Sequence, residues 1–88
     1  MMTQWPTVRE LFRAKVITED DLVAAIDAYM ADPSTSAFFL SEDHVLDLTA
    51  AVCASRFAAM TLADPTTAQI SKRSAVRKAI LLARPASA

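Results

Sequence analysis

Apolar residues recur at helical spacing in four segments of the chain, and residues that start or stop helices mark the boundaries of these segments. Each segment begins near a serine or threonine that can cap a helix, and three end at a proline, which disfavours helical geometry in the residue before it. The predicted helices span residues 8–15, 19–31, 42–63 and 67–83. The pattern therefore predicts an all-α fold, a compact four-helix domain over residues 1–88 with a long central third helix.

The predicted helix starts carry side chains that can satisfy free backbone amides. Three pairs have the three-residue spacing of a capping box or a close variant of it, namely Thr7 with Glu10, Thr18 with Asp21, and Thr66 with Gln69. Ser41 is followed by two acidic residues, which the helix dipole favours in a first turn. These positions support four separate helix starts.

The chain contains no glycine and no asparagine. These two residues most readily adopt the positive φ that tight hairpin turns and left-handed helix caps require. A hairpin-rich β architecture is therefore disfavoured, and proline becomes the main helix stop. One such stop recurs 32 positions apart, as Ala-Asp-Pro-Ser-Thr at residues 31–35 and Ala-Asp-Pro-Thr-Thr at residues 63–67.

The predicted third helix has large apolar side chains over more than half of its circumference and alanines on most of the rest, so we expect neighbours on at least two sides. Arg56 falls between those large apolar side chains. In one interpretation it reaches solvent through a gap between two packed faces. In the other it forms a buried or interfacial ion pair, with an acid such as Asp20 or Asp27 or with a carboxylate of a partner.

Charge is distributed unevenly along a chain whose net charge is −1. Residues 1–18 carry a net charge of +2, residues 19–64 carry −8, and residues 65–88 carry +5. One interpretation is that basic terminal helices pack beside acidic middle helices and that the charges compensate within the molecule. The other is that the basic end binds an acidic partner.

Three arginines of the predicted last helix, Arg73, Arg77 and Arg84, fall on one stripe that apolar residues flank. Arginine pairs with carboxylate or phosphate through two parallel hydrogen bonds, while its stem covers apolar surface. The stripe therefore predicts a binding surface for an acidic protein or, as the alternative, for a nucleic-acid backbone.

A helix-turn-helix unit can be drawn within the same segment. Its turn would lie at Ala75, and Ser74 would cap a second helix that carries Arg77 and Lys78 into a groove of DNA. The net charge and the missing turn glycine disfavour it, because unaided DNA binders usually have a basic domain. In a third alternative, the acidic middle of the chain mimics nucleic acid and blocks a basic groove of another protein.

The chain lacks the residues of familiar catalytic and cofactor sites. Without glycine it can form neither a Walker A loop nor a dinucleotide-binding fingerprint, which bring backbone close to phosphate. One histidine, His44, and one cysteine, Cys53, fall short of a transition-metal site. We interpret His44 as a solvated residue and Cys53 as a small buried hydrophobe. We therefore expect no enzyme, no cofactor and no metal.

Aromatic residues supply candidate interface anchors. Phe38 and Phe39 are adjacent in the connection before the predicted third helix, where one ring can cap the core but both can hardly face inward. Trp5, near the first residue, is a further candidate. The mean hydropathy of +0.27 is high for so small a chain and indicates apolar area kept for a partner.

The sequence thus predicts a non-enzymatic accessory or structural subunit, of a size typical of phage or mobile-element products, that binds another protein and self-associates. The alternatives are the helix-turn-helix-like nucleic-acid-binding regulator and the acidic inhibitor that mimics nucleic acid. No apolar run approaches the roughly 18 residues of a membrane helix, and residues 1–6 do not resemble a secretion signal. We expect a cytoplasmic protein.

Overall fold

The computed structural model describes residues 6–87, and within them it contains five helices and a three-stranded antiparallel sheet. The helices are α1 (Val8–Arg13), α2 (Glu19–Ala31), α3 (Leu48–Cys53), α4 (Arg56–Ala63) and α5 (Gln69–Leu82). The strands are β1 (Phe38–Ser41), β2 (His44–Leu46) and β3 (Ala86–Ser87), with β2 in the middle of the sheet. The fold is therefore mixed α and β, and the prediction of an all-α four-helix domain is wrong.

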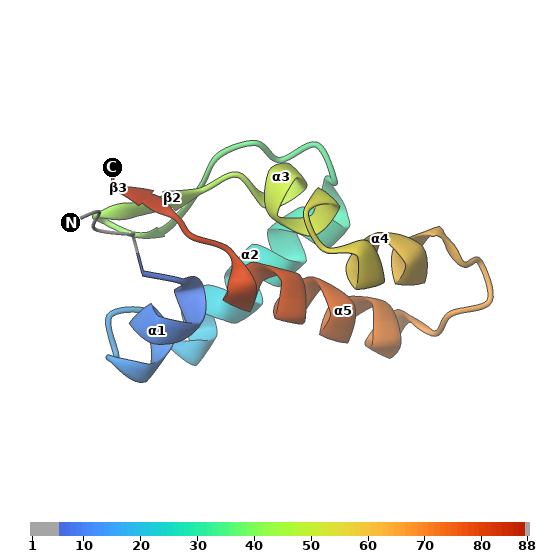
Figure 1. Ribbon diagram of the computed structural model, residues 1–88, viewed down its shortest axis with the longest axis horizontal. Helices are drawn as coiled ribbons and strands as arrows, with labels where there is room; N and C mark the ends of the chain where they lie inside the picture. Colours follow the sequence, from blue (N-terminus) through green and yellow to red (C-terminus); the bar gives the residue numbers. More distant parts are fainter. Residues whose placement is uncertain (1–5, 88) are drawn as a thin grey trace.

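Figure 1 shows how the two kinds of structure are separated in space. The small sheet lies at one end of the molecule, and the connection between α4 and α5 lies at the other end. Helix α5 runs between them and contacts each of the other four helices. The central helix of the fold is thus α5, rather than the long third helix that the sequence predicts.

The error arises in residues 42–63, which form a strand and two short helices instead of one long helix. Ser41 pairs with His44 across a turn that contains Glu42 and Asp43, and the register shifts between Phe39 and Ser41. Among residues 6–87 only Lys15 is a non-glycine residue with positive φ, so this turn needs no left-handed residue. A bulge next to a turn of this kind restores the twist that the strands require, and a hairpin therefore forms without glycine or asparagine.

A break at Ala54 and Ser55 separates α3 from α4. The Ser55 hydroxyl accepts a hydrogen bond from the backbone N–H of Ala58 at 3.2 Å, so Ser55 caps the start of α4. Asp47 caps α3 in the same way, through the N–H of Ala50 at 2.9 Å. These short polar side chains compete with helix continuation. The helical spacing of apolar residues is therefore interrupted between α3 and α4 and does not run through both.

The first two capping boxes are confirmed, and α2 has the bounds predicted for it. The predicted cap at Thr66 is wrong, because the backbone N–H and the hydroxyl of Thr66 both donate to Asp64 Oδ1, at 2.9 and 2.7 Å. Helix α5 begins instead at Gln69 without a side-chain cap. The matching turn after α2 has Ser34 donating in the same two ways to Asp32 Oδ1. The repeated proline stop therefore corresponds to a repeated local turn.

The core lies where α5 meets the other helices and where β1 packs against α2. Its largest fully buried side chains come from α1, α2, β1, α3, α5 and the turn after α1, and they are Ile17, Leu22, Leu40, Leu48, Ile80, Val8, Val52 and Val76. The start of α1 is tied to the end of α5, since the Val8 N–H donates to the Ala83 carbonyl at 2.8 Å. The sides of α4 and α5 that do not pack in this core remain exposed to solvent.

Candidate functional site

Helices α4 and α5 carry exposed large apolar side chains next to each other. Phe57 of α4 is 59% exposed and Leu82 of α5 is 64% exposed. Lys78 is a neighbour of both, because its Nζ is 5.6 Å from the centre of the Phe57 ring and it precedes Leu82 by one helical turn. Two more exposed apolar residues, Met60 and Ile70, belong to the same pair of helices. Exposed apolar side chains gathered in this way mark an interaction surface more often than isolated ones do.

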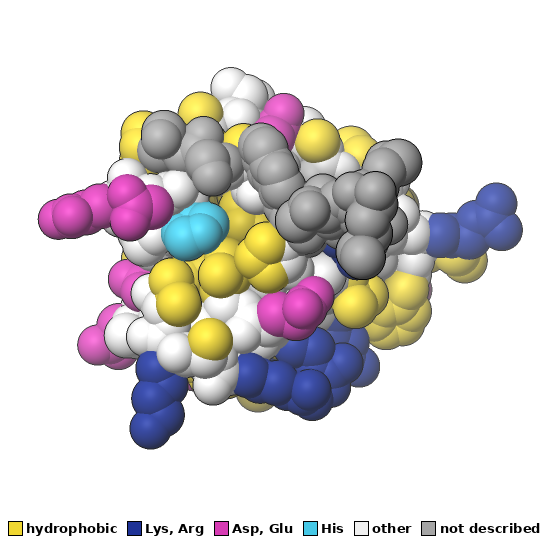
Figure 2. Space-filling view, turned by 60° about the vertical axis from the view of Figure 1, so that its left-hand side comes forward, with side chains coloured by type: hydrophobic (Ala, Val, Ile, Leu, Met, Phe, Trp, Pro, Cys, Tyr) yellow, Lys and Arg dark blue, Asp and Glu magenta, His cyan; other side chains and the backbone are white. Residues whose placement is uncertain are grey.

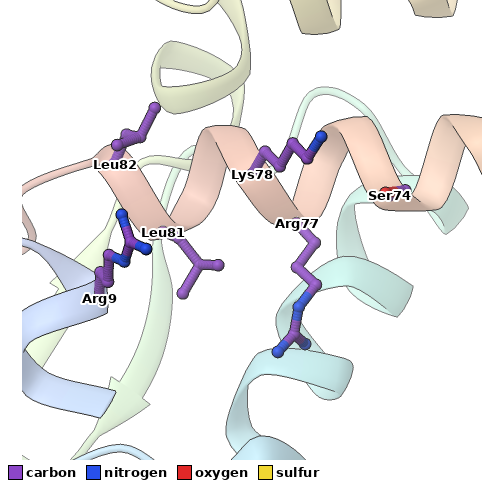
Figure 3. A pocket seen from close by; sticks show the side chains of 6 residues that line it. All are labelled: Arg9, Ser74, Arg77, Lys78, Leu81 and Leu82. Atoms are coloured by element: carbon purple, nitrogen blue, oxygen red, sulfur yellow. The ribbon is translucent and has the colours of Figure 1, made fainter. Parts of the chain in front are cut away.

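A basic cleft of about 490 Å³ lies beside this surface, between α1 and α5. Its lining residues are Arg9, Ser74, Arg77, Lys78, Leu81 and Leu82. In Figure 3, Lys78 and Leu82 point to one side of α5, Arg77 and Leu81 point to the other, and Arg9 reaches in from α1. The cleft therefore combines three positively charged side chains with leucines.

The cations of this region differ in how their charge is compensated. Arg77 Nη1 is 2.9 Å from Glu19 Oε2, and Arg73 Nη2 is 2.7 Å from Asp27 Oδ1, so both arginines pair with α2. Compensation within the molecule is therefore confirmed for these two arginines. Among the residues that the structure describes, neither Arg9 nor Lys78 has a carboxylate within salt-bridge distance. These two cations remain available to a partner.

Figure 2 shows that charge is also separated over the end of the molecule that carries the sheet. Acidic side chains lie mainly on the left of this view, and basic side chains lie mainly at the bottom and on the right. Hydrophobic side chains occupy part of the area between them. The uneven charge of the sequence thus persists as an uneven charge of the surface.

The arginine stripe is shorter than the sequence predicts. Helix α5 ends at Leu82, so the exposed Arg84 lies beyond the helix and lines a different hollow of about 500 Å³ beside α3 and β2. Arg56 is exposed at the first position of α4, and no charged side chain is buried within residues 6–87. A buried ion pair at Arg56 is therefore not formed, whereas a contact from Arg56 to a partner stays a prediction.

The helix-turn-helix arrangement drawn within the last helix is wrong in its geometry. Residues Gln69–Leu82 form one continuous helix, so no turn occurs at Ala75 and Ser74 caps nothing. Ser74 instead lies in the middle of α5 and lines the basic cleft.

The predicted aromatic anchors are in different environments. Phe38 is half-buried and packs against the core, while Phe39 is 63% exposed on the edge strand β1. This difference follows from the alternation of side chains along a strand, and Leu40 accordingly points inward again. Trp5 lies outside the described residues. An interface role for Phe39 stays a prediction.

The sequence interpretation missed Phe57, Leu82 and Arg9 as surface residues. In a single helix over residues 42–63 Phe57 would belong to the apolar face, whereas the break at Ser55 leaves it exposed on α4. The available signal was Ser55 itself, a good helix-capping residue inside an otherwise apolar run. The prediction that Cys53 is buried is wrong, because it is exposed at the end of α3.

His44 is half-buried in β2, and its Nδ1 lies 2.9 Å from Ser41 Oγ, a hydrogen bond that fastens the hairpin turn. Within residues 6–87 no three His, Cys, Asp or Glu side chains are grouped to hold a metal ion. In the same range, no helix has both the length and the hydrophobicity to cross a membrane.

No protein-family model, no curated protein and no solved structure matches this chain. Function depends on sites rather than on folds, so a role has to be inferred from the surface that these residues present. The surface formed by Phe57, Lys78 and Leu82 with the basic cleft is the most distinctive one.

Proposed function

We propose that this protein is a non-enzymatic binding domain, an accessory or structural subunit that docks another protein on α4 and α5 beside the basic cleft. The observation that carries the proposal is the exposure of Phe57 and Leu82, both of them neighbours of Lys78. Burying an exposed Phe or Leu side chain contributes about 1.5 to 3 kcal/mol. An aromatic ring with a neighbouring aliphatic side chain is typical of the centre of a protein interface, with charged residues at the rim.

A nucleic-acid partner is less well supported by the same residues. Phosphate binding uses several free cations, but Arg73 and Arg77 already pair with Asp27 and Glu19. The net charge of −1 would repel a polyanion at long range. The acidic mimic of nucleic acid meets the corresponding difficulty, because two of its carboxylates are engaged within the molecule.

The test is a quantitative pull-down from an extract of the cells that make the protein. Phe57→Ser combined with Leu82→Ser removes the apolar centre, and Val16→Ser with Val23→Ser is the matched control, since these valines are also exposed but lie on the α1–α2 side. We expect the wild type and the control to retain the same partner. The affinity of the Phe57 and Leu82 variant should fall at least about a hundredfold, since the loss of both side chains removes about 3 kcal/mol or more of binding energy.

Two results would contradict the proposal. The partner could be retained equally by the Phe57 and Leu82 variant, or it could be lost equally with the Val16 and Val23 control. A gel-retardation assay with duplex DNA is the complementary measurement. Strong binding that weakens steeply with salt would favour the nucleic-acid alternative.

A further inference from the structure

The basic cleft has more positively charged side chains than ion pairs with carboxylates of the described residues. Three cations line the cleft, and the only ion pair that the described residues give them is that of Arg77 with Glu19. Two positive charges, on Arg9 and Lys78, therefore face solvent next to Leu81 and Leu82. A segment that binds here gains most if it brings carboxylates together with apolar side chains.

A second, smaller hollow lies along the same helix. This second hollow, of about 200 Å³, is lined mainly by small side chains, namely Ala51, Ala54, Ser55, Ala79, Leu82 and Ala83. Leu82 lines both hollows, so they are neighbours along α5, and we call the two together the groove. Small side chains let another backbone approach closely, and a groove with apolar anchors and a charged rim is a known way to bind an amphipathic helix.

A second copy of the chain would be a poor occupant of this groove. In a twofold dimer the same patch meets itself, which would bring Arg9 and Lys78 close to their own copies. The acids of α2 nearest the cleft, Glu19 and Asp27, are already paired with arginines of α5. The charge of the groove thus calls for carboxylates from a different protein.

We infer that the groove along α5 receives an acidic amphipathic helix of a partner protein, an inference that rests on the proposed function. The apolar side of that helix lies on Phe57 and Leu82, and carboxylates on its flanks pair with Arg9 and Lys78. The distance from Ser74 to Leu82 is about 12 Å along the axis of α5, at 1.5 Å per residue. A partner helix of about three turns, roughly 16 Å long, is therefore sufficient to cover both hollows.

The first experiment uses two synthetic peptides and the full 88-residue chain. One peptide has leucines at the i, i+3, i+4 and i+7 spacing of an amphipathic helix and glutamates on both flanks, and the other has lysines in place of the glutamates. We expect the glutamate peptide to bind with a Kd on the order of 10 to 100 µM, since a short helix must fold as it binds. The lysine peptide should bind at least about tenfold more weakly.

Charge reversals in the protein locate the site. Arg9→Glu and Lys78→Glu should each weaken binding of the glutamate peptide by about five- to tenfold. Lys15→Glu makes the same change of charge at an exposed position in the turn after α1 and should change the Kd less than about twofold. Thermal unfolding of each variant verifies that the fold is retained.

The outcomes separate this inference from the proposed function. Equal binding of the two peptides, or wild-type affinity in the Arg9→Glu and Lys78→Glu variants, would overturn the inference that an acidic helix binds in the groove. If the cellular partner is then still lost with the Phe57 and Leu82 variant, a protein-binding role stands with a partner of different charge. Weakening by both charge reversals, with the Lys15→Glu control unchanged, supports the inference.

Discussion

Two faces of helix α5 carry similar residues and use them differently. Ile80 and Leu82 are two positions apart and of similar size, but Ile80 is fully buried whereas Leu82 is 64% exposed. The inner face meets the other helices, while the outer face carries Ser74, Lys78 and Leu82 at intervals of one helical turn. The comparison shows that apolar character alone does not assign a residue of this helix to the core.

A third side of α5 lies between these two faces. It carries Arg73 and Arg77, and α2 neutralises both with Asp27 and Glu19. Cations on the α2 side are therefore paired, and the cation on the outer face lies over an aromatic ring. The neighbouring helices, rather than the residue types, decide which charges are left for a partner.

The largest expected effect separates the inner face from the outer one. Ile80→Ala should lower the free energy of unfolding by about 3 kcal/mol, because it removes apolar contacts and leaves a cavity. Leu82→Ala should change it by less than about 0.5 kcal/mol, since most of this side chain is already in solvent. Urea unfolding followed by circular dichroism measures both. Equal losses in the two variants would mean that Leu82 also belongs to the core.

A smaller effect is expected for the paired arginines. Arg73→Ala and Arg77→Ala should each cost less than about 1 kcal/mol, because both ion pairs are partly exposed and screened by water. The cost should shrink further at high ionic strength. Lys78→Ala, which breaks no ion pair, is the matched control in the same urea titration. A salt-independent loss of several kcal/mol for either arginine would contradict a solvent-screened pair.

The smallest effect concerns the turn before α5. Hydrogen bonds from the Thr66 side chain and backbone, with the charge of Lys72, lower the pKa of Asp64 from its ordinary value of 3.8. A lowered pKa in the folded state means that the turn adds stability above pH 3.8, and that this stability is lost as pH falls through the folded pKa.

Thr66→Ala should therefore raise the pKa of Asp64 toward the ordinary value. The matching turn after α2 is the internal control, because hydrogen bonds from Ser34 lower the pKa of Asp32 in the same way and Thr66→Ala leaves them intact. Carboxyl chemical shifts in an NMR titration report both groups. An unchanged pKa of Asp64 would show that the Thr66 hydroxyl does not hold this turn.

Local signals predicted the first part of the fold. Thr7 and Thr18 each have an acid three residues later, and these contacts involve neighbours in sequence alone. The hairpin escaped prediction because its turn uses Glu42 and Asp43 and lacks the residues that usually mark such turns. Residues 42–63 also fit a helical pattern, so only pairing of β2 with β1 and β3 decides for a strand.

The candidate site was predicted in part and for a physical reason. The basic, partly apolar character of the last helix was evident in its sequence, and α5 does line the cleft. Which cations pair with α2 depends on how α2 and α5 pack, and the paired residues are 46 and 58 positions apart in the sequence, so no local pattern contains this information. The exposure of Phe57 could not be predicted without the break between α3 and α4 at Ser55.

The hydrogen bond from Val8 to Ala83 has a consequence for the order of events during synthesis. Helix α1 cannot take its final place until the chain has grown by another 75 residues, the distance between these two positions. At ribosomal rates this takes about 4 to 15 s. During that interval Val8 and Leu11, which are buried in the finished fold, lack the surface of α5 that they pack on. The nascent chain is therefore most exposed to aggregation and to chaperones just before α5 emerges.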